Sequence, residues 1–509
     1  MSKNKYFKKQ AMHKLSVGCA VVLSVSSVVT PLQSVLVSAE TNKTGKYYTA
    51  FDNYDQEQEA AYELNEEIAG ESIVLLKNRD NALPLKEEEN AVTAFGIGSA
   101  YTSYGAQGSG QQSATEQQHL VTFAEGLENA GIKVNPEVMS LYKQAGAAAR
   151  GETSRETSLG GSDSKIVESD LKPEQLKTAE TSYALYDDAA VVVITREGGE
   201  GEEHEFSRTQ YYDNTDKTEE DEYAHGLMLT PTERETLQYA EENFDKVIVL
   251  INSTNVMELG ELEDDDNVDA VLWVGAPGVS GFNAVGKVLT GEINPSGHTS
   301  DIYPSNLTED PTWFNYADQS GVIQTEEEYA GETAGEVSKA YDSEGNTIDM
   351  SSTSTAIETV SYLEGIYMGY RWYETQAELG NYYAADSMPN NDDATYDTSD
   401  TYYNRDNGVV YPFGYGLSYT TFDWSNFTAN LSEDGTQITV SVDVTNTGSV
   451  AGKDVVQIYY KDPYYDGQIE KASANLVEFV KTDNLQPGET QTVTTTFDVK
   501  DMASFDYND

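Results

Sequence analysis

AAVVVIT (189–195), KVIVLIN (246–252) and DAVLWVGA (269–276) are three uninterrupted apolar runs of strand length. A fourth run of the same kind, AVTAFGIG, occupies residues 91–98. Continuous apolar runs are typical of strands that are covered on both faces, as in a parallel sheet. Helix-length segments separate the four runs along the chain. This alternation predicts a doubly wound, mostly parallel α/β sandwich domain.

Two helices are signalled around these strands. The stretch LTPTE (229–233) combines a capping threonine, a proline suited to the first helical position and a glutamate three residues after the cap, which predicts a helix over 231–243. A second helix is predicted from Glu59 to about residue 77, because apolar residues recur there at helical spacing. Its apolar face would consist of Leu64, Ile68, Ile73 and Leu76.

After Trp424 the pattern changes to alternation of apolar and polar residues. The predicted strands are QITVSVDV (437–444), DVVQIYY (454–460) and TVTTTFDV (492–499). Turn residues separate them, so residues 424–509 are predicted to form an antiparallel β-sandwich like a fibronectin type III domain. The pattern stops before a last strand pair, and we therefore expect a truncated sandwich. A sandwich complete with fewer strands is the alternative.

The N-terminus has the layout of a secretory signal. Lysines precede an apolar stretch at 17–29, and VSA (37–39) offers small residues for cleavage. The stretch is shorter than the roughly 18 residues that span a bilayer. We therefore expect a signal peptide over 1–39 and a secreted chain without membrane insertion after cleavage. Cys19 is the only cysteine, so the mature chain would hold no disulfide and no thiol nucleophile.

Charge and local composition indicate possible partners and how the rest of the chain is organised. A formal charge of −56 over 509 residues argues against nucleic acid and anionic membranes as partners, because both would be repelled. Residues 40–58 are polar and are predicted to be a linker, which leaves 59–423 for the α/β domain. Within that domain, residues 318–360 are acidic and rich in serine and threonine, which indicates an insertion.

Motifs for cofactors and metals fail at specific positions. Gly96 and Gly98 follow a predicted strand, but Tyr101 stands where a dinucleotide fingerprint needs its third glycine. There is no Walker glycine-lysine loop, and DNTDKTEEDE (213–222) lacks the central glycine of a calcium loop. No metal-ligand spacing connects His119, His204, His225 and His298. We predict neither a cofactor nor a metal.

Two glycine-bearing stretches follow predicted strands: TSYGAQGSGQQ (102–112) and EGGEGEE (197–203). Ligands bind beyond the carboxyl ends of the strands in open α/β sheets, and glycines allow the backbone to approach them closely. Ser109 or Glu200 could contact such a ligand. From composition alone, a functional loop and a flexible acidic loop are equally open.

A family resemblance rests on six motifs in order. They are ESIVLLKN (71–78) with LPL (83–85), GSG (108–110), Arg196 with GEG (199–201), NPSG (294–297), IYMGYRWY (366–373) and YPFGYGLSY (411–419). Together they resemble the second domain of glycoside hydrolase family 3, typified by β-glucosidases. Residues 424–509 likewise resemble the fibronectin-like module that follows it in that family.

The resemblance implies a retaining hydrolase of terminal β-linked sugars, with a carbohydrate substrate. Glu200 matches the acid/base glutamate, and its neighbours Glu197, Glu202 and Glu203 would help to hold its proton near neutral pH, because like charges disfavour ionisation. Ser109 matches a serine that reaches the bound sugar. Arg196 is a substrate-binding candidate, although its place in the motif favours a packing role.

Two departures from the family accompany the resemblance. Glu203-His204 stands where relatives usually carry an aspartate-arginine pair, which puts the anchoring of the loop in doubt. The family's TIM barrel, which supplies the nucleophilic aspartate, finds no counterpart, so the chain resembles the barrel-free part of a permuted member. Alternatives are a non-catalytic carbohydrate-binding or surface protein derived from this fold, or the product of an interrupted gene.

Overall fold

The computed structural model of the chain describes residues 50–105, 119–150, 171–196, 226–307, 310–312, 339–341, 347–349, 364–379, 408–465 and 467–506. The chain divides into two compact units, residues 1–65 and 66–509. Helix α3 (Tyr54–Ser72) begins in the first unit. The sheets and sites below all belong to the second unit. The predicted signal peptide lies outside the described residues.

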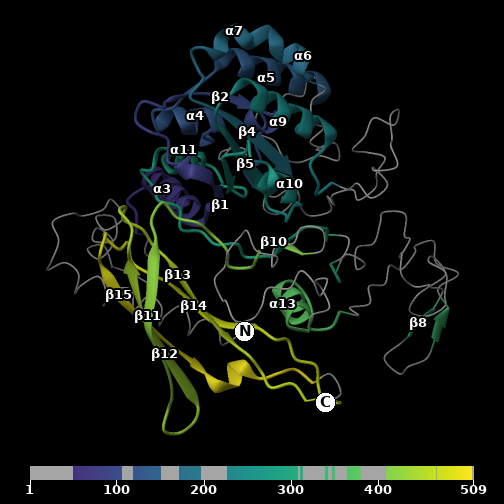
Figure 1. Ribbon diagram of the computed structural model, residues 1–509, viewed down its shortest axis with the longest axis vertical. Helices are drawn as coiled ribbons and strands as arrows, with labels where there is room; N and C mark the ends of the chain where they lie inside the picture. Colours follow the sequence, from purple (N-terminus) through teal and green to yellow (C-terminus); the bar gives the residue numbers. More distant parts are fainter. Residues whose placement is uncertain are drawn as a thin grey trace. The chain divides into compact units, whose positions relative to one another are not determined.

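A six-stranded sheet forms the centre of the α/β domain (Figure 1). Its strand order is β1-β6-β5-β4-β2-β3; β1 runs antiparallel to β6, and the other neighbours are parallel. The strands are β1 (Val74–Asn78), β2 (Ala91–Phe95), β3 (Lys133–Val134), β4 (Ala189–Arg196), β5 (Val247–Ser253) and β6 (Ala270–Trp273). The four apolar runs are β2, β4, β5 and β6, which confirms the predicted mostly parallel sheet.

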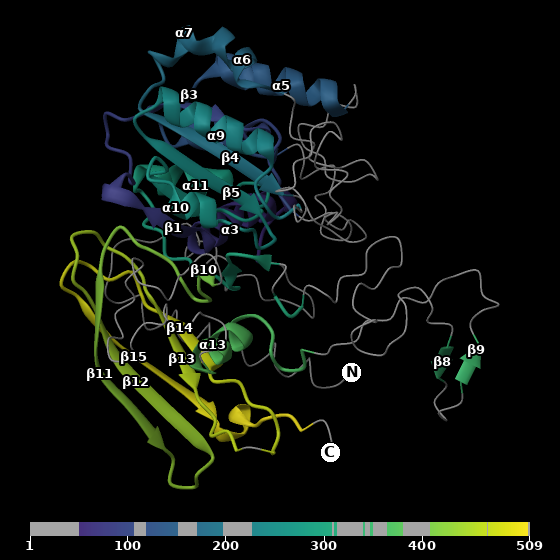
Figure 2. The same cartoon turned by 45° about the vertical axis from the view of Figure 1, so that its right-hand side comes forward.

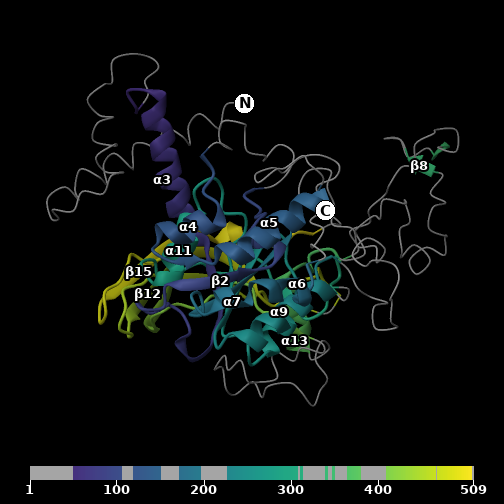
Figure 3. The same ribbon diagram turned by 90° about the horizontal axis from the view of Figure 1, so that it is seen from above.

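Helices cover both faces of this sheet, as the view from above shows (Figure 3). One face packs against α5 (Pro136–Arg150), α6 (Pro173–Leu176), α7 (Glu180–Tyr183), α9 (Pro231–Asn243) and α10 (Gly260–Asp264). The other packs against α4 (Phe123–Asn129), α11 (Phe282–Thr290) and the end of α3. Along β4, Val192 lies in the first core and Val193 in the second. Both faces are buried, and the apolar run is therefore continuous.

The capping signal of α9 is confirmed in detail. The Thr230 hydroxyl accepts a hydrogen bond from the Glu233 backbone N–H at 3.2 Å, and the Glu233 carboxylate accepts one from the Thr230 N–H at 2.8 Å. This reciprocal pair satisfies two backbone donors that no helical carbonyl can reach. The helix accordingly begins at Pro231, as predicted.

The helix predicted from Glu59 to about residue 77 begins earlier, at Tyr54, and the prediction is wrong beyond Ser72. Helix α3 ends at Ser72, and β1 begins at Val74. Leu64 and Ile68 are 44% and 57% exposed, so they do not form the buried face that the spacing suggested. Residues 74–78 instead pair with β6, and that pairing buries Leu76 completely. Tertiary pairing outweighs the local helical periodicity here.

The C-terminal domain consists of two antiparallel sheets that form a β-sandwich (Figure 2). One sheet contains β11 (Phe422–Leu431), β12 (Gln437–Asn446) and β15 (Thr490–Asp498), and the other contains β13 (Val455–Tyr460) and β14 (Asn475–Lys481). Val444, Val456 and Val493 belong to the core of the sandwich. The alternation-based prediction of an antiparallel sandwich is confirmed, although β11 and β14 were not predicted.

Shorter elements complete the described chain. They are η1 (Arg79–Asn81), η2 (Ile97–Ser99), η5 (Lys177–Ala179), β7 (Tyr303–Pro304) paired with β10 (Val409–Tyr411), β8 (Lys339–Tyr341) paired with β9 (Thr347–Asp349), α13 (Tyr370–Leu379) and η10 (Val499–Met502). Of the predicted insertion at 318–360, only β8 and β9 are described. Among the described helices, none has both the length and the apolar character needed to cross a membrane.

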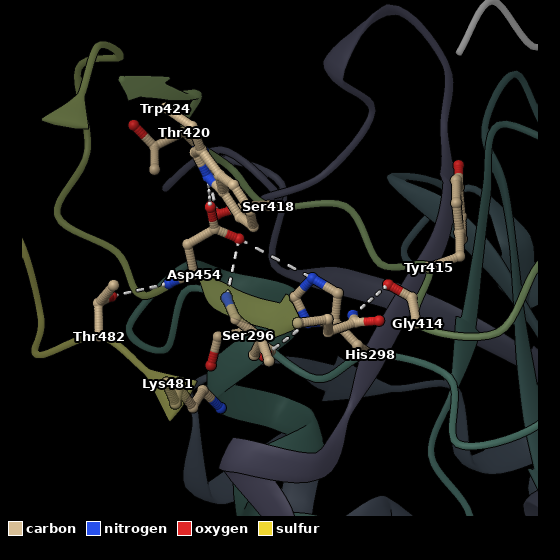
Figure 4. Close-up of polar contacts among 12 residues, drawn as sticks. Ser296, His298, Gly414, Tyr415, Ser418, Thr420, Trp424, Asp454, Lys481 and Thr482 are labelled. Carbon is tan, nitrogen blue, oxygen red and sulfur yellow. Dashed lines mark hydrogen bonds and ion pairs between the residues drawn. The ribbon is translucent and has the colours of Figure 1, made fainter. Parts of the chain in front are cut away.

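Polar contacts connect the α/β domain to the sandwich. Glu71 pairs with Lys453 and with Lys481, the latter at 2.5 Å. Nearby, Nε2 of His298 lies 3.9 Å from Oδ1 of Asp454, whose other oxygen accepts a 2.7 Å hydrogen bond from the Trp424 indole (Figure 4). These contacts join segments that are far apart in the sequence, and they hold the regions around Glu71 and His298 against the sandwich.

Candidate functional site

The carboxyl ends of β2, β4 and β5 meet at one edge of the sheet, because these neighbouring strands are parallel. Polar side chains gather where the apolar runs end. Thr195 and Arg196 close β4, and they pair in register with Asn252 and Ser253 at the end of β5. This is the edge at which open α/β sheets bind ligands.

Arg196 forms a buried clamp at this edge. Its guanidinium makes a bidentate ion pair with Glu233 of α9, with Nη1–Oε1 at 2.6 Å and Nη2–Oε2 at 2.7 Å. Arg196 is 4% exposed and Glu233 5%. Nε also donates to the carbonyl of Gly226 at 2.7 Å, and Nη2 donates to that of Met228 at 2.7 Å. A planar fork of donors suits this set of fixed acceptors.

The clamp determines where the segment 197–225 leaves and rejoins the described fold. Arg196 is the residue before that segment and Gly226 the residue after it. The side chain of the first holds the carbonyl of the second, so both ends of the segment are anchored at the carboxyl end of β4. Glu233 adds α9 to this anchor, because one of its carboxylate oxygens also caps the helix.

Asn252 anchors the start of the other glycine-bearing stretch, residues 102–112. Its side chain is fully buried. Oδ1 accepts a hydrogen bond from the Ser103 N–H at 2.6 Å, and Nδ2 donates to the carbonyls of Ser103 at 2.8 Å and Gly275 at 2.6 Å. A single amide therefore joins the start of the 102–112 stretch to the ends of β5 and β6.

Gly98 explains the glycines that follow β2. A Cβ at this position would lie 2.8 Å from the carbonyl oxygen of Val193 and would also collide with the Thr195 side chain. The absence of a side chain lets the backbone after β2 pass directly over β4. Gly98 therefore has a packing role.

Of the three predicted site residues, only Arg196 lies in the described part of the chain. Its guanidinium donates hydrogen bonds to protein acceptors. Ser109 and Glu200, with the neighbouring Glu197, Glu202 and Glu203, lie outside the described residues. The structure thus brings together the anchor points of both stretches at one edge. The assignments of Glu200, Ser109 and Arg196 to catalysis and sugar binding stay predictions.

Sequence reasoning missed Glu233 and Asn252 as parts of this site. Glu233 was recognised only as a helix cap. An arginine at the end of a fully apolar strand needs a buried carboxylate, and that requirement was the available signal. Within the described ranges, no group of three or more histidine, cysteine, aspartate or glutamate side chains is arranged to hold a metal.

Comparisons with known proteins agree with this architecture. The sequence profile of the Glycosyl hydrolase family 3 C-terminal domain matches residues 73–370, and that of the Fibronectin type III-like domain matches residues 454–509. Beta-glucosidase A of Butyrivibrio fibrisolvens is 29% identical over 463 residues, which are 87% of this chain and 46% of that protein. A beta-glucosidase of Ruminococcus albus is 28% identical over 86% of this chain and 36% of that protein.

A solved structure gives the same result. Beta-glucosidase 3B from Thermotoga neapolitana, in complex with glucose, superimposes with a TM-score of 0.63 at 27% identity, covering 90% of this chain and 51% of that one. The chain thus spans less than half of the length of the two curated relatives above. The first profile alone matches more than half of the chain, over the α/β domain described above. The chain belongs to glycosyl hydrolase family 3.

Proposed function

We propose that this chain carries the acid/base half of a β-glucosidase-type active site, with Glu200 as the proton donor. The observation that supports this most is the Arg196 clamp, which anchors both ends of the segment containing Glu200 at the ligand-binding edge of the sheet. Asn252 anchors the segment containing Ser109 at the same edge. The named activity of the relatives adds to this support.

The chemistry follows from what a retaining glycosidase requires. Two carboxyl groups lie about 5–5.5 Å apart; one attacks the anomeric carbon while the other protonates the departing oxygen. In the second step the deprotonated acid removes a proton from water, which displaces the enzyme carboxylate from the sugar. Glu200 performs both proton transfers in this proposal. Ser109 binds a hydroxyl of the sugar, and Arg196 contributes by positioning the segment of Glu200.

The nucleophilic carboxylate comes from a TIM-barrel domain outside these 509 residues. This part of the proposal rests on the family resemblance and on the share of the relatives that the chain spans. Without that carboxylate the covalent intermediate cannot form. The purified chain alone should therefore hydrolyse aryl β-glucosides negligibly, and turnover at an ordinary enzymatic rate would contradict the proposal.

The decisive experiment uses the longer polypeptide that the gene encodes if its reading frame continues beyond codon 509 into a barrel. Glu200→Gln should lower kcat/KM about 10²–10⁴-fold for a glucoside with a poor leaving group. The loss should be much smaller for a dinitrophenyl glucoside, whose leaving group needs no proton. Glu219→Gln, at a carboxyl of the same segment outside the glutamate cluster, is the matched control. Equal losses on both substrates would show that Glu200 is not the acid.

Export is a separate part of the proposal. A lysine-rich start, a short apolar stretch and VSA (37–39) support a signal peptide over residues 1–39 and a secreted product. N-terminal sequencing of the protein recovered from culture medium should begin at Glu40. A protein retained in cells with residues 1–39 intact would contradict it.

A further inference from the structure

A cavity of about 410 Å³ opens beside the candidate site, at the carboxyl ends of β5 and β6. Its lining includes Leu227, Thr254, Asn255, Trp273, Asp301 and Tyr303. Trp273 ends β6, and Thr254 follows the last residue of β5. Leu227 follows Gly226, whose carbonyl the Arg196 clamp holds. The cavity therefore borders the point at which the segment containing Glu200 rejoins the fold.

The lining combines aromatic walls with neutral hydrogen-bonding groups. Trp273 is half-buried and Tyr303 is buried. Burial, with a smaller contribution from the charge of Asp301, raises the pKa of the Tyr303 phenol, so the phenol stays protonated. Thr254 and Asn255 supply a hydroxyl and an amide from the end of β5. Together with Thr299, Ser300 and Asp301, these groups make about half of the lining polar, and placed polar groups of this kind fix the orientation of a bound ligand.

The polar groups limit what the cavity can hold. The carboxylate of Asp301 accepts one hydrogen bond, from the Ile302 N–H to Oδ1 at 2.8 Å, and within the described chain Oδ2 receives none. Oδ1 of Asn255 accepts from the Thr254 hydroxyl at 3.1 Å, whereas Nδ2 has no acceptor among the described residues. A ligand in the cavity can therefore donate to Asp301 and accept from Asn255. Hydroxyl groups do both, whereas an alkylammonium ion can only donate.

We propose that this cavity binds one neutral pyranose sugar as a non-catalytic site next to the Glu200 segment. Its volume lies at the lower end of the roughly 300–1,000 Å³ that is usual for small-molecule pockets, which fits a monosaccharide. The negative charge of Asp301 and of the whole chain disfavours an anionic ligand. The site goes beyond the proposed function, because sugar binding here requires neither Glu200 nor a nucleophile.

The test is a saturation-transfer NMR titration of the purified 509-residue chain with D-glucose. We expect saturable binding in the millimolar range, the affinity that a ligand of this size reaches at ordinary efficiency. Asp301→Asn should weaken binding about tenfold, because a hydrogen bond to a charged acceptor is lost. Asp301 is exposed, so this variant should fold. Asp266→Asn, the same change at another exposed aspartate, should have no effect.

Three results would overturn the inference. They are no saturable glucose binding, binding that Asp301→Asn leaves unchanged, and saturable binding of tetramethylammonium in place of glucose, which would indicate a cation site between aromatic rings. Trp273→Leu provides a second variant, since loss of the aromatic wall should also reduce glucose binding. None of these results bears on the hydrolase proposal, which depends on turnover by Glu200.

Discussion

Arg196 at the end of β4 and Glu233 in the first turn of α9 form a bidentate ion pair that is almost completely buried, with N–O distances of 2.6 and 2.7 Å. The pair joins the residue before the segment 197–225 to the helix that begins shortly after it. Buried ion pairs persist only when further hydrogen bonds satisfy the remaining donors. Here the carbonyls of Gly226 and Met228 serve that purpose.

Removal of the carboxylate charge should be costly. In Glu233→Gln the Arg196 guanidinium stays buried without a counter-charge, and the free energy of unfolding should fall by about 3–5 kcal/mol. Urea denaturation of the purified chain measures this. The matched control is Glu261→Gln, which breaks the bidentate but solvent-exposed pair with Arg234 at 2.6 Å and should cost less than about 1 kcal/mol. Equal losses in both variants would contradict the clamp.

Asn252 should be nearly as sensitive, for a different reason. Asn252→Ala leaves the Ser103 N–H and the carbonyls of Ser103 and Gly275 without their buried partner. Each such unsatisfied group costs about 1–3 kcal/mol unless water enters. We expect a clear fall in the denaturation midpoint, and faster proteolysis near Ser103. Asn129→Ala, at an exposed asparagine that bonds only Asn283 in the described chain, is the control and should leave both unchanged.

The sheet could be predicted because each of its long strands is recognisable from its own few residues. Each residue of β4 is buried on one face or the other, so an unbroken apolar run is required and can be recognised. Helix α9 was equally accessible, since its cap lies within four consecutive residues. Strand β1 was not, because Val74–Asn78 becomes a strand only by pairing with β6 almost 200 residues away. Helical spacing in the preceding segment extended the predicted helix through it.

The anchors of the candidate site were hidden for the same reason. Asn252 and Ser103 are 149 residues apart in sequence, and no periodicity connects them. Arg196 and Glu233 are 37 residues apart, and each had a sufficient local explanation, one as a family motif residue and the other as a cap. The specific roles predicted for Glu200 and Ser109 came from the motif resemblance. Physical reasoning from the residues placed their stretches at strand ends, and the described anchors lie there.

Gly98 allows a steric test of how closely the backbone after β2 packs against β4. Gly98→Ala places a Cβ 2.8 Å from the Val193 carbonyl oxygen, a backbone atom of the central strand that cannot move freely. Overpacking of this kind costs about 1–3 kcal/mol, which thermal unfolding would detect. Gly260→Ala is the control, because its nearest neighbour lies at an ordinary 3.5 Å. A Gly98→Ala variant as stable as the control would show that the loop after β2 can shift away from β4.

His298 should make the contact between the α/β domain and the sandwich sensitive to acid. Burial lowers the pKa of His298 below its ordinary value, although the nearby Asp454 opposes the shift and Lys481 adds to it (Figure 4). The folded protein therefore binds its proton less readily than the unfolded chain does. The contribution of this residue is present above about pH 6.5 and is lost as the pH falls below it. His298→Gln should flatten the pH dependence of the unfolding free energy in that window. An unchanged slope would contradict the assignment.

Glu241 predicts a pH dependence of the opposite sign. Burial, together with the neighbouring negative charge of Asp265, raises the pKa of Glu241 to about 7. The unfolded chain loses this proton near pH 4.5, whereas the folded protein keeps it until about pH 7. Stability is therefore complete below pH 4.5 and is lost as the pH rises to 7. Because Glu241 is only half-buried and solvent screens its charge, we expect a change of only about 1 kcal/mol.

Glu241→Gln removes the charge that must be buried at high pH. It should raise the free energy of unfolding by about 1 kcal/mol at pH 8 and leave it unchanged at pH 4, as measured by urea denaturation at both values. Glu128→Gln, at an exposed carboxylate on α4, is the control and should change neither. If Glu241→Gln were equally stabilising at both pH values, the gain would come from packing or helix propensity. Proton linkage to the Glu241–Asp265 pair would then be excluded.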